Sequence, residues 1–172
     1  MRLTALIFLG LASTATAEDR TAFFGITYLD TSLQGETRGV DPAETARLEM
    51  LQAMVRDRFT AEGFELVETA PVQTKLDRIV NPAKCNGCDT RMAQDLGADL
   101  SLVGEVQKVS NLIIAMNLQL RDAETGEMLR GGVVDIRANT DDAWRRVRGE
   151  RPEPTHRPAV VYRVRPDGRV EG

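Results

Sequence analysis

The chain has 172 residues, 42% of them apolar, with 22 basic and 26 acidic side chains and a formal net charge of −4. This length and composition are those of one soluble globular domain, and they exclude a disordered chain, a collagen and a polytopic membrane protein. The negative charge argues against a protein that binds nucleic acid through bulk electrostatics. Two cysteines and one histidine are too few for a disulfide-dense scaffold or a four-cysteine zinc site, and they leave little room for histidine chemistry.

The N-terminal segment has the pattern of an export signal. Arg2 precedes an apolar run, residues 3–12, and Ala15 and Ala17 form an A-x-A cleavage site. The run is too short for the roughly twenty residues that a spanning helix needs, and no cysteine follows it. We therefore expect neither a membrane anchor nor a bacterial lipoprotein. Residues 1–17 are predicted to be a signal peptide, cleaved after Ala17, that directs the protein to the periplasm.

The first half of the mature chain predicts two strands and two helices. Residues 22–29 are rich in aromatic and β-branched types and predict a buried strand, and residues 64–69 predict a shorter one. Between them, residues 41–63 predict a helix, because they open on a capping Asp, a Pro and, at the third position, Glu44. A short second helix is expected over 89–97, capped by its first residue and ended by a glycine.

The second half predicts three antiparallel strands. Apolar and polar residues alternate over 100–107 and again over 112–120. This period of two predicts that one face of each strand is buried and that the other face is exposed to solvent. Residues 122–127 predict a hairpin turn and 128–138 predict the returning strand, and a last helix opens at Thr140.

Together these elements predict the α/β class. We expect a single domain over residues 18–148, with a mixed sheet of about five strands in the order β-α-β-α-β-β-β-α and helices on one face. The composition changes beyond it, since four of the seven prolines lie within 152–166 and only 159–164 resembles a strand. Residues 149–172 are therefore expected to form a Pro/Arg-rich tail that is extended or loosely attached.

Two blocks of sequence carry a resemblance to a known family. They comprise residues 85–88 with 93–99, and residues 104–111 with 122–126, 134–141 and 144–146. Over roughly residues 23–146 the chain resembles an uncharacterised family of secreted proteobacterial proteins, classed as a domain of unknown function. Its Leu-Gly-Ala-Asp element, Gly-containing strand and Asp-x-x-Thr-Gly hairpin are also similar to the N-terminal domain of TolB and to CsgG-like envelope proteins. That resemblance implies a non-catalytic domain that contacts other envelope proteins.

Cys85 and Cys88 are the one constellation with reactive chemistry. In an oxidising compartment two cysteines at this spacing predict a structural disulfide, whose small loop stabilises the fold by about 2 kcal/mol. A redox-active dithiol is the first alternative, because thiols at the start of a helix ionise more readily, and a metal site is the second. Haem attachment would need a histidine where Asp89 stands, and zinc would need two further ligands.

The wet face of the last three strands offers amide, carboxylate and guanidinium groups that suit a protein partner or a polar ligand, although a solvated surface would have the same composition. Trp144 and Arg145 belong to residue types that are over-represented at binding hot spots, while Trp144 would pack equally well under the sheet. The candidate partner-binding residues are Glu105, Gln107, Asn117, Gln119, Asp135, Arg137, Trp144 and Arg145.

The sequence contains no nucleophile-elbow, Walker or dinucleotide-binding pattern, so no catalytic residue, cofactor or metal ligand is assigned. With the export signal, this predicts a periplasmic accessory protein without enzymatic activity that binds another protein of the cell envelope. Neither a nucleic-acid partner nor a membrane span is expected. A thiol–disulfide redox protein that uses Cys85 and Cys88 is the alternative.

Overall fold

A computed structural model describes residues 19–148, 163–164 and 170–171. The strands of the domain are β1 (Arg20–Asp30), β2 (Glu65–Val67), β3 (Leu100–Ser110), β4 (Ile113–Asp122) and β5 (Met128–Ile136). The helices are α1 (Leu33–Arg38), α2 (Pro42–Ala61), α3 (Gln73–Leu76), α4 (Cys88–Asp95) and α5 (Asp141–Arg145), with 3-10 turns η1 (Ala70–Val72), η2 (Pro82–Lys84) and η3 (Arg146–Arg148).

The two predicted terminal segments lie largely outside this description. The predicted signal peptide, residues 1–17, lies wholly outside the described residues. Of the predicted tail, residues 149–172, the structure describes two short strands, β6 (Arg163–Val164) and β7 (Val170–Glu171), which pair with each other.

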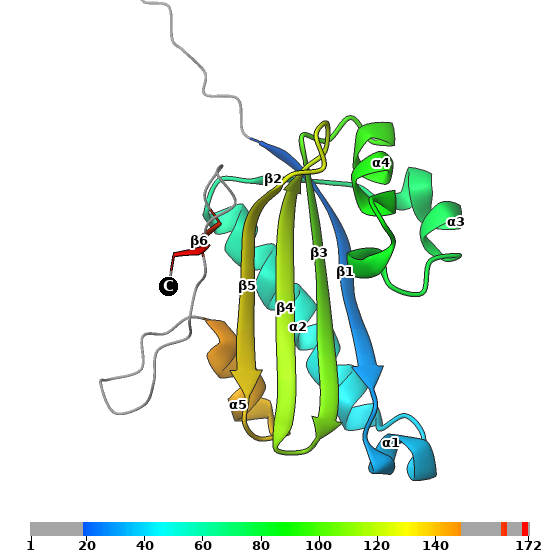
Figure 1. Cartoon of the computed structure of the whole chain (residues 1–172), viewed down its shortest axis with the longest axis vertical. Coiled ribbons are helices and arrows are strands. Elements are labelled where there is room, and N and C mark those ends of the chain that lie inside the picture. Colours follow the sequence, from blue (N-terminus) through cyan, green and yellow to red (C-terminus); the bar gives the residue numbers. More distant parts are fainter. Residues whose placement is uncertain (1–18, 149–162, 165–169, 172) are drawn as a thin grey trace, which may run out of the picture.

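The five strands of the domain form one mixed sheet in the order β2-β1-β3-β4-β5 (Figure 1). β1 lies between β2 and β3 and runs parallel to both, whereas β3, β4 and β5 are antiparallel. Parallel neighbours require a long crossover, and here the crossovers contain α1 with α2 and α3 with α4. The predicted α/β class and the predicted mixed five-stranded sheet are confirmed.

One face of the sheet, which we call the α2 face, packs against α2 and α5, and α2 crosses behind the strands in Figure 1. Leu51 of α2 contacts the same core as Phe23, Leu102 and Ile114 of the sheet, and all four are at most 2% exposed. On this face, alternate residues of β3 and β4 are buried at positions that the period of two assigned to the core, namely Leu102, Val106, Ile114, Met116 and Leu120. The apolar side chains of this face therefore stabilise the domain by leaving water.

The sequence predicts helices on one face of the sheet, but the structure also places the η2 turn and α4 on the opposite face. There η2 and α4 contact β3, and Met92 and Ala93 of α4 form a second apolar cluster with Ala22, Phe24 and Val103 of β1 and β3. Phe24 and Val103 are large apolar residues on a face that would otherwise be exposed to solvent, so another segment must pack over them. The segment between β2 and β3 does so, and both faces of β1 and β3 are therefore covered at this end of the sheet.

The N-terminal part of α2 combines a predicted cap with an unpredicted buried charge. The Asp41 side chain accepts a hydrogen bond from the backbone N–H of Ala43, as expected of a capping residue. Glu44, however, does not complete the cap. It is 1% exposed and accepts hydrogen bonds from Lys108 Nζ at 2.5 Å and from the Tyr28 hydroxyl at 2.7 Å. The first turn of α2 therefore places the Glu44 carboxylate in the core, where it contacts Lys108 of β3.

Gly104 is a point of tight packing at the centre of β3. A Cβ atom there would lie 3.0 Å from Cγ1 of Ile26 and 3.2 Å from Cδ1 of Leu118. Gly104→Ala is expected to lower the free energy of unfolding by about 1–3 kcal/mol, because extra atoms displace well-packed neighbours. Gly132→Ala is the matched control: nothing lies within 4 Å of that Cβ, and alanine loses less backbone entropy than glycine. Urea unfolding measures both variants, and equal losses would contradict this account.

Candidate functional site

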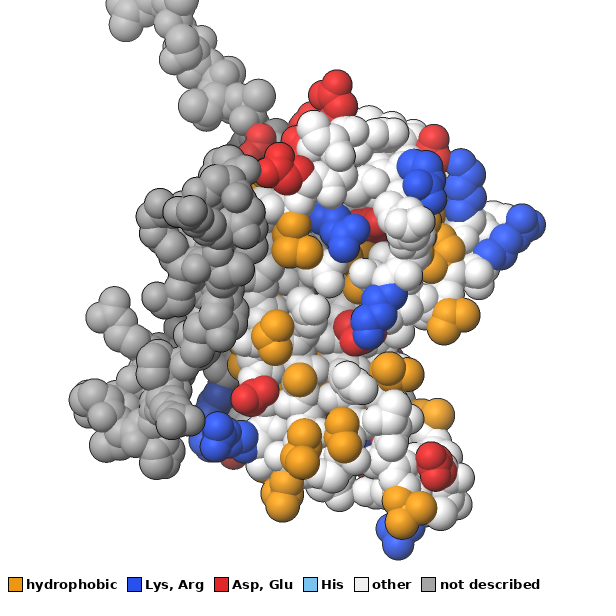
Figure 2. Space-filling view, viewed as in Figure 1, with side chains coloured by type: hydrophobic (Ala, Val, Ile, Leu, Met, Phe, Trp, Pro, Cys, Tyr) orange, Lys and Arg blue, Asp and Glu red, His pale blue; other side chains and the backbone are white. Residues whose placement is uncertain are grey.

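The strand residues predicted to bind a partner lie on the face opposite α2, which faces the viewer in Figure 2. This face has two regions. In the covered region, η2, the following loop and α4 pack on β1 and β3. In the open region, nearer the other end of the strands, side chains of β1, β3, β4 and β5 reach the surface. The open region consists of Leu29, Gln107, Ile113, Asn117, Val133 and Asp135.

Two of the predicted partner-binding residues are buried in or beside the covered region. Glu105 is 6% exposed, and its carboxylate accepts hydrogen bonds from the Asn81 amide and, at 2.8 Å, from Lys84 Nζ. Gln119 is 9% exposed, and its Oε1 accepts a hydrogen bond from Arg121 Nη2 at 2.6 Å. Buried polar groups need such partners. Because this chain supplies them, Glu105 and Gln119 are not available to another protein, and their assignment to a partner surface is corrected.

Cys85 and Cys88 form a disulfide at the start of α4, with their Cα atoms 5.4 Å apart. Asn86 and Gly87 between them both have a positive φ, of 55° and 77°, which brings the two sulfur atoms together over a short loop. Gly87 is the residue that precedes α4. The expected cap, Asp89, instead lies inside the first turn. The pair is therefore placed where a helix begins, as its spacing suggested.

Asp89 is a fully buried carboxylate beneath the disulfide. Its Oδ2 accepts a hydrogen bond from Ser101 Oγ at 3.0 Å, and Arg121 Nη1 lies 3.8 Å from its Oδ1. The same Oδ1 lies 3.8 Å from Cys85 Sγ. The carboxylate thus joins α4 to β3 and β4, and its position in the first turn of α4 is favourable for the helix dipole. The sequence pattern marked Asp89 only as a capping residue.

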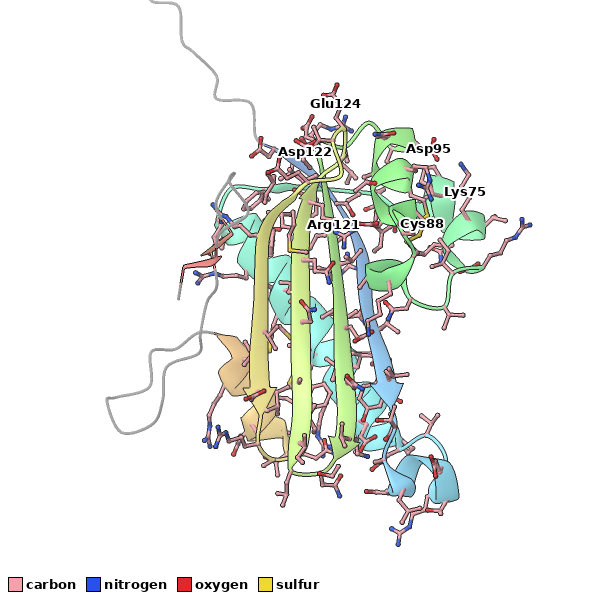
Figure 3. All side chains as sticks on the ribbon, in the orientation of Figure 1. Lys75, Cys88, Asp95, Arg121, Asp122 and Glu124 are labelled. Carbon is pink, nitrogen blue, oxygen red and sulfur yellow. A yellow bond between two sulfur atoms is a disulfide. The ribbon has the colours of Figure 1, made fainter. Side chains whose placement is uncertain are left out.

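A cavity of about 410 Å³ lies between α3 and α4, and Cys88 lines it. Lys75 of α3 and Asp95 of α4, labelled in Figure 3, form an ion pair of 2.7 Å beside it. Arg91 adds a second cationic side chain, and Ile79 and Met92 add apolar surface. Cys88 therefore lines a partly basic, partly apolar hollow.

The open region combines apolar and polar side chains on neighbouring strands. Ile113 is 60% exposed and Val133 is 47% exposed, beside Asn117 and Asp135 on the same two strands. Leu29 of β1, 39% exposed, extends the region across the sheet. Figure 2 shows apolar side chains over this part of the face. A surface that sets exposed aliphatic side chains among amides and a carboxylate suits a protein partner better than a small charged ligand.

Sequence reasoning missed the aliphatic residues of the open region, although the period of two could have found them. Ile113 is separated from Asn117 by four positions in β4, and Val133 from Asp135 by two in β5, so each shares a face with a residue assigned to the wet side. The apolar residues are diluted among polar ones. A selection of only the polar residues on this face therefore leaves out Ile113 and Val133.

The remaining predicted residues lie away from the open region or at its margin. Trp144 is fully buried on the α2 face, where its indole N–H donates to Asn139 Oδ1 at 3.2 Å. A buried ring cannot contact a partner, so the placement of Trp144 on a partner surface is corrected. Arg145, on the next position of α5, is exposed and lies 3.5 Å from Asp142. Arg137 is exposed just after β5.

Among the described residues, no group of three or more His, Cys, Asp or Glu side chains is arranged to hold a metal ion. Within the same part of the chain, no helix is both long enough and apolar enough to cross a bilayer.

Several solved structures are similar to this chain. The lipoprotein GNA1162 from Neisseria meningitidis has 17% identity, with a TM-score of 0.48 over 72% of this chain and 83% of its own. The LpoB C-terminal domain from Salmonella enterica has 19% identity, with a TM-score of 0.48 over 73% of this chain and 87% of its own. The hypothetical protein CT253 from Chlamydia trachomatis has 14% identity, with a TM-score of 0.38 over 69% and 71%.

No curated protein matches the chain. A family model described as "Protein of unknown function (DUF2380)" matches residues 19–149, which include the whole sheet and the helices that cover it. The match spans well over half of the 172 residues and agrees with the uncharacterised family that the sequence resembles. The chain therefore belongs to this family of proteins of unknown function.

Proposed function

We propose that this protein is a periplasmic accessory protein that binds another protein of the cell envelope through the open region of its sheet, and that this binding surface has no enzymatic activity. The observation that carries the proposal is the exposure of Leu29, Ile113 and Val133 on one sheet face, among polar residues that can set the orientation of a partner. Aliphatic side chains exposed together are stabilised when a partner removes them from water.

Two sequence features support the cellular setting. The segment 1–17 has the pattern of a signal peptide, which favours export. The resemblance of the sequence to the N-terminal domain of TolB and to CsgG-like proteins favours a role in the envelope. Gln107, Asn117 and Asp135 then remain as candidate polar contacts of the proposed interface, with Arg137 at its margin.

The open region can be tested by site-specific crosslinking in the periplasm. A photoreactive amino acid in place of Ile113 should give an adduct of one defined mass with a partner protein. Val133→Asp should reduce this adduct at least fivefold, because a charge in a desolvated interface loses its hydration.

The matched control is Val80→Asp, which places the same charge on a residue that is 93% exposed outside the open region. It should leave the adduct unchanged. If Val133→Asp and Val80→Asp act alike, or if Ile113 gives only a smear of nonspecific products, the open region is a solvated surface and the proposal fails. Circular dichroism of both variants verifies that the domain is folded.

A further inference from the structure

The two sulfur atoms of the disulfide lie in electrostatically different surroundings. Cys88 is the first residue of the eight-residue helix α4, so the positive end of the helix dipole lies beside it. Lys75 and Arg91, two cationic side chains, line the same cavity as Cys88. Asp95 offsets one of these charges through its ion pair with Lys75. The surroundings of Cys88 therefore favour a negatively charged sulfur.

The surroundings of Cys85 have the opposite effect. Its Sγ lies 3.1 Å from the carbonyl oxygen of Pro82 and 3.8 Å from Oδ1 of Asp89. Asp89 is fully buried, so solvent screens its charge little. A negative charge on Cys85 would be repelled by both oxygen atoms. The surroundings of the two sulfur atoms therefore favour a negative charge on Cys88 over one on Cys85.

From this asymmetry we infer that Cys85 and Cys88 form a thiol–disulfide exchange centre, in which Cys88 is the nucleophile and Cys85 the resolving thiol. The substrate class is a disulfide in a polypeptide segment. The cavity beside Cys88 offers the partly exposed Ile79 to an apolar side chain, and Lys75 and Arg91 to an acidic residue next to the substrate cysteine. This activity is independent of the open region, which lies elsewhere on the sheet.

The Cys88 thiolate attacks one sulfur of the substrate disulfide, which forms a mixed disulfide and releases the other substrate sulfur as a thiolate. That thiolate takes the proton of Cys85. The Cys85 sulfur then attacks Cys88 Sγ, closes the disulfide present in this structure, and releases the first substrate sulfur as a thiolate. The substrate gains two electrons, and a dithiol protein reduces the Cys85–Cys88 pair again by the reverse steps.

Asp89 has a positioning role in the second half of this sequence. Its Oδ1 belongs to the described carboxylate nearest to Cys85 Sγ, so Asp89 can pass the proton that Cys85 loses on to the released substrate thiolate. Asp89→Asn keeps the shape but removes this acceptor, so the mixed disulfide should accumulate in that variant while its formation is unaffected. Asp57→Asn, an exposed change on α2, is the control and should not accumulate it.

The first experiment compares the two single-cysteine variants of the full chain, Cys85→Ser and Cys88→Ser, with oxidised glutathione as the probe at pH 6. Cys85→Ser should form its mixed disulfide on the order of tenfold faster, because it retains the stabilised thiolate. Lys75→Met with Arg91→Met should remove most of this difference, and in concentrated urea the two variants should react alike. Equal rates in the folded proteins would overturn the assignment of Cys88.

The second experiment equilibrates the wild-type chain with mixtures of reduced and oxidised glutathione. An exchange centre should be found partly as disulfide and partly as dithiol across these mixtures. A pair that stays fully oxidised in a large excess of reduced glutathione is a structural disulfide, because such bonds resist reduction by this thiol, and the inference is then wrong. That result would leave the proposed binding function untouched, since crosslinking at Ile113 tests it separately.

Discussion

Replacing Lys108 with methionine should lower the free energy of unfolding by about 3–5 kcal/mol, since it leaves buried carboxylates without their cation. Lys108 is 1% exposed, and its ammonium lies 2.5 Å from Glu44 Oε1 and 3.1 Å from Asp30 Oδ2. Methionine fills similar space but cannot donate a hydrogen bond. Urea unfolding of the folded variant measures the loss.

Two further variants separate this effect from a general sensitivity to charge removal. Arg58→Met breaks an exposed ion pair with Glu62 and should cost at most about 0.5 kcal/mol. Glu44→Gln combined with Lys108→Met should recover part of the loss, because the neutral amide no longer needs a cation. A loss under about 1 kcal/mol for Lys108→Met alone would mean that water reaches the site.

The same cluster predicts a pH dependence with a defined sign. Burial alone would lower the pKa of Lys108, but hydrogen bonds to Glu44 and Asp30 outweigh it and raise that pKa above its ordinary value. The stabilisation is therefore complete below about pH 10.4 and is lost as the pH rises through the folded-state pKa. The pKa of Tyr28 is raised by burial and by its hydrogen bond to Glu44, and this contribution is lost in the same direction.

Asp30 has the opposite dependence. Burial would raise its pKa, but hydrogen bonds from Ser32 and the Lys108 ammonium hold that pKa below its usual range. Its contribution is present above about pH 3.9 and is lost as the pH falls through the folded-state pKa. Lys108→Met should therefore flatten the alkaline decline and reduce the size of the acid decline, because the pKa of Asp30 then lies closer to its unfolded-state value. Unfolding curves measured from acid to alkaline pH detect both changes.

Trp144→Ala is the second large effect, with an expected loss of about 3–5 kcal/mol. The ring is fully buried, lies 6.2 Å from the Tyr28 ring between centroids, and belongs to the cluster beneath the sheet. Its removal opens a cavity that α5 alone cannot fill. Arg145→Ala, one position further on an exposed side chain, should stay within about 0.5 kcal/mol.

Thermal unfolding monitored by circular dichroism compares the two variants, because Trp144 is the fluorescent probe that the first one removes. If Trp144→Ala lowers the free energy of unfolding as little as Arg145→Ala does, the ring lies at the surface, and Trp144 is again a candidate partner contact. Trp144 and Glu44 both hydrogen-bond to Asn139, so Trp144→Ala and Lys108→Met should not be additive.

The amino-acid sequence by itself determined the local features of this protein. The period of two in β3 and β4 identified the strands and their buried face, the Asp-Pro start identified α2, and the spacing of Cys85 and Cys88 identified the pair that bonds. These features depend on residues close together in the chain, where backbone geometry fixes which side chains share a face. The α/β class followed from their order.

Only the tertiary structure decided which polar residues are buried and which apolar residues are exposed. Lys108 sits at a core position of β3, but its partners Glu44 and Asp30 are 64 and 78 positions away. Glu105 was expected on a wet face and is covered by η2, whereas Ile113 on the same face is not. Periodicity assigns a residue to a face. Whether that face meets solvent depends on which distant segments pack on it, and no local pattern records that.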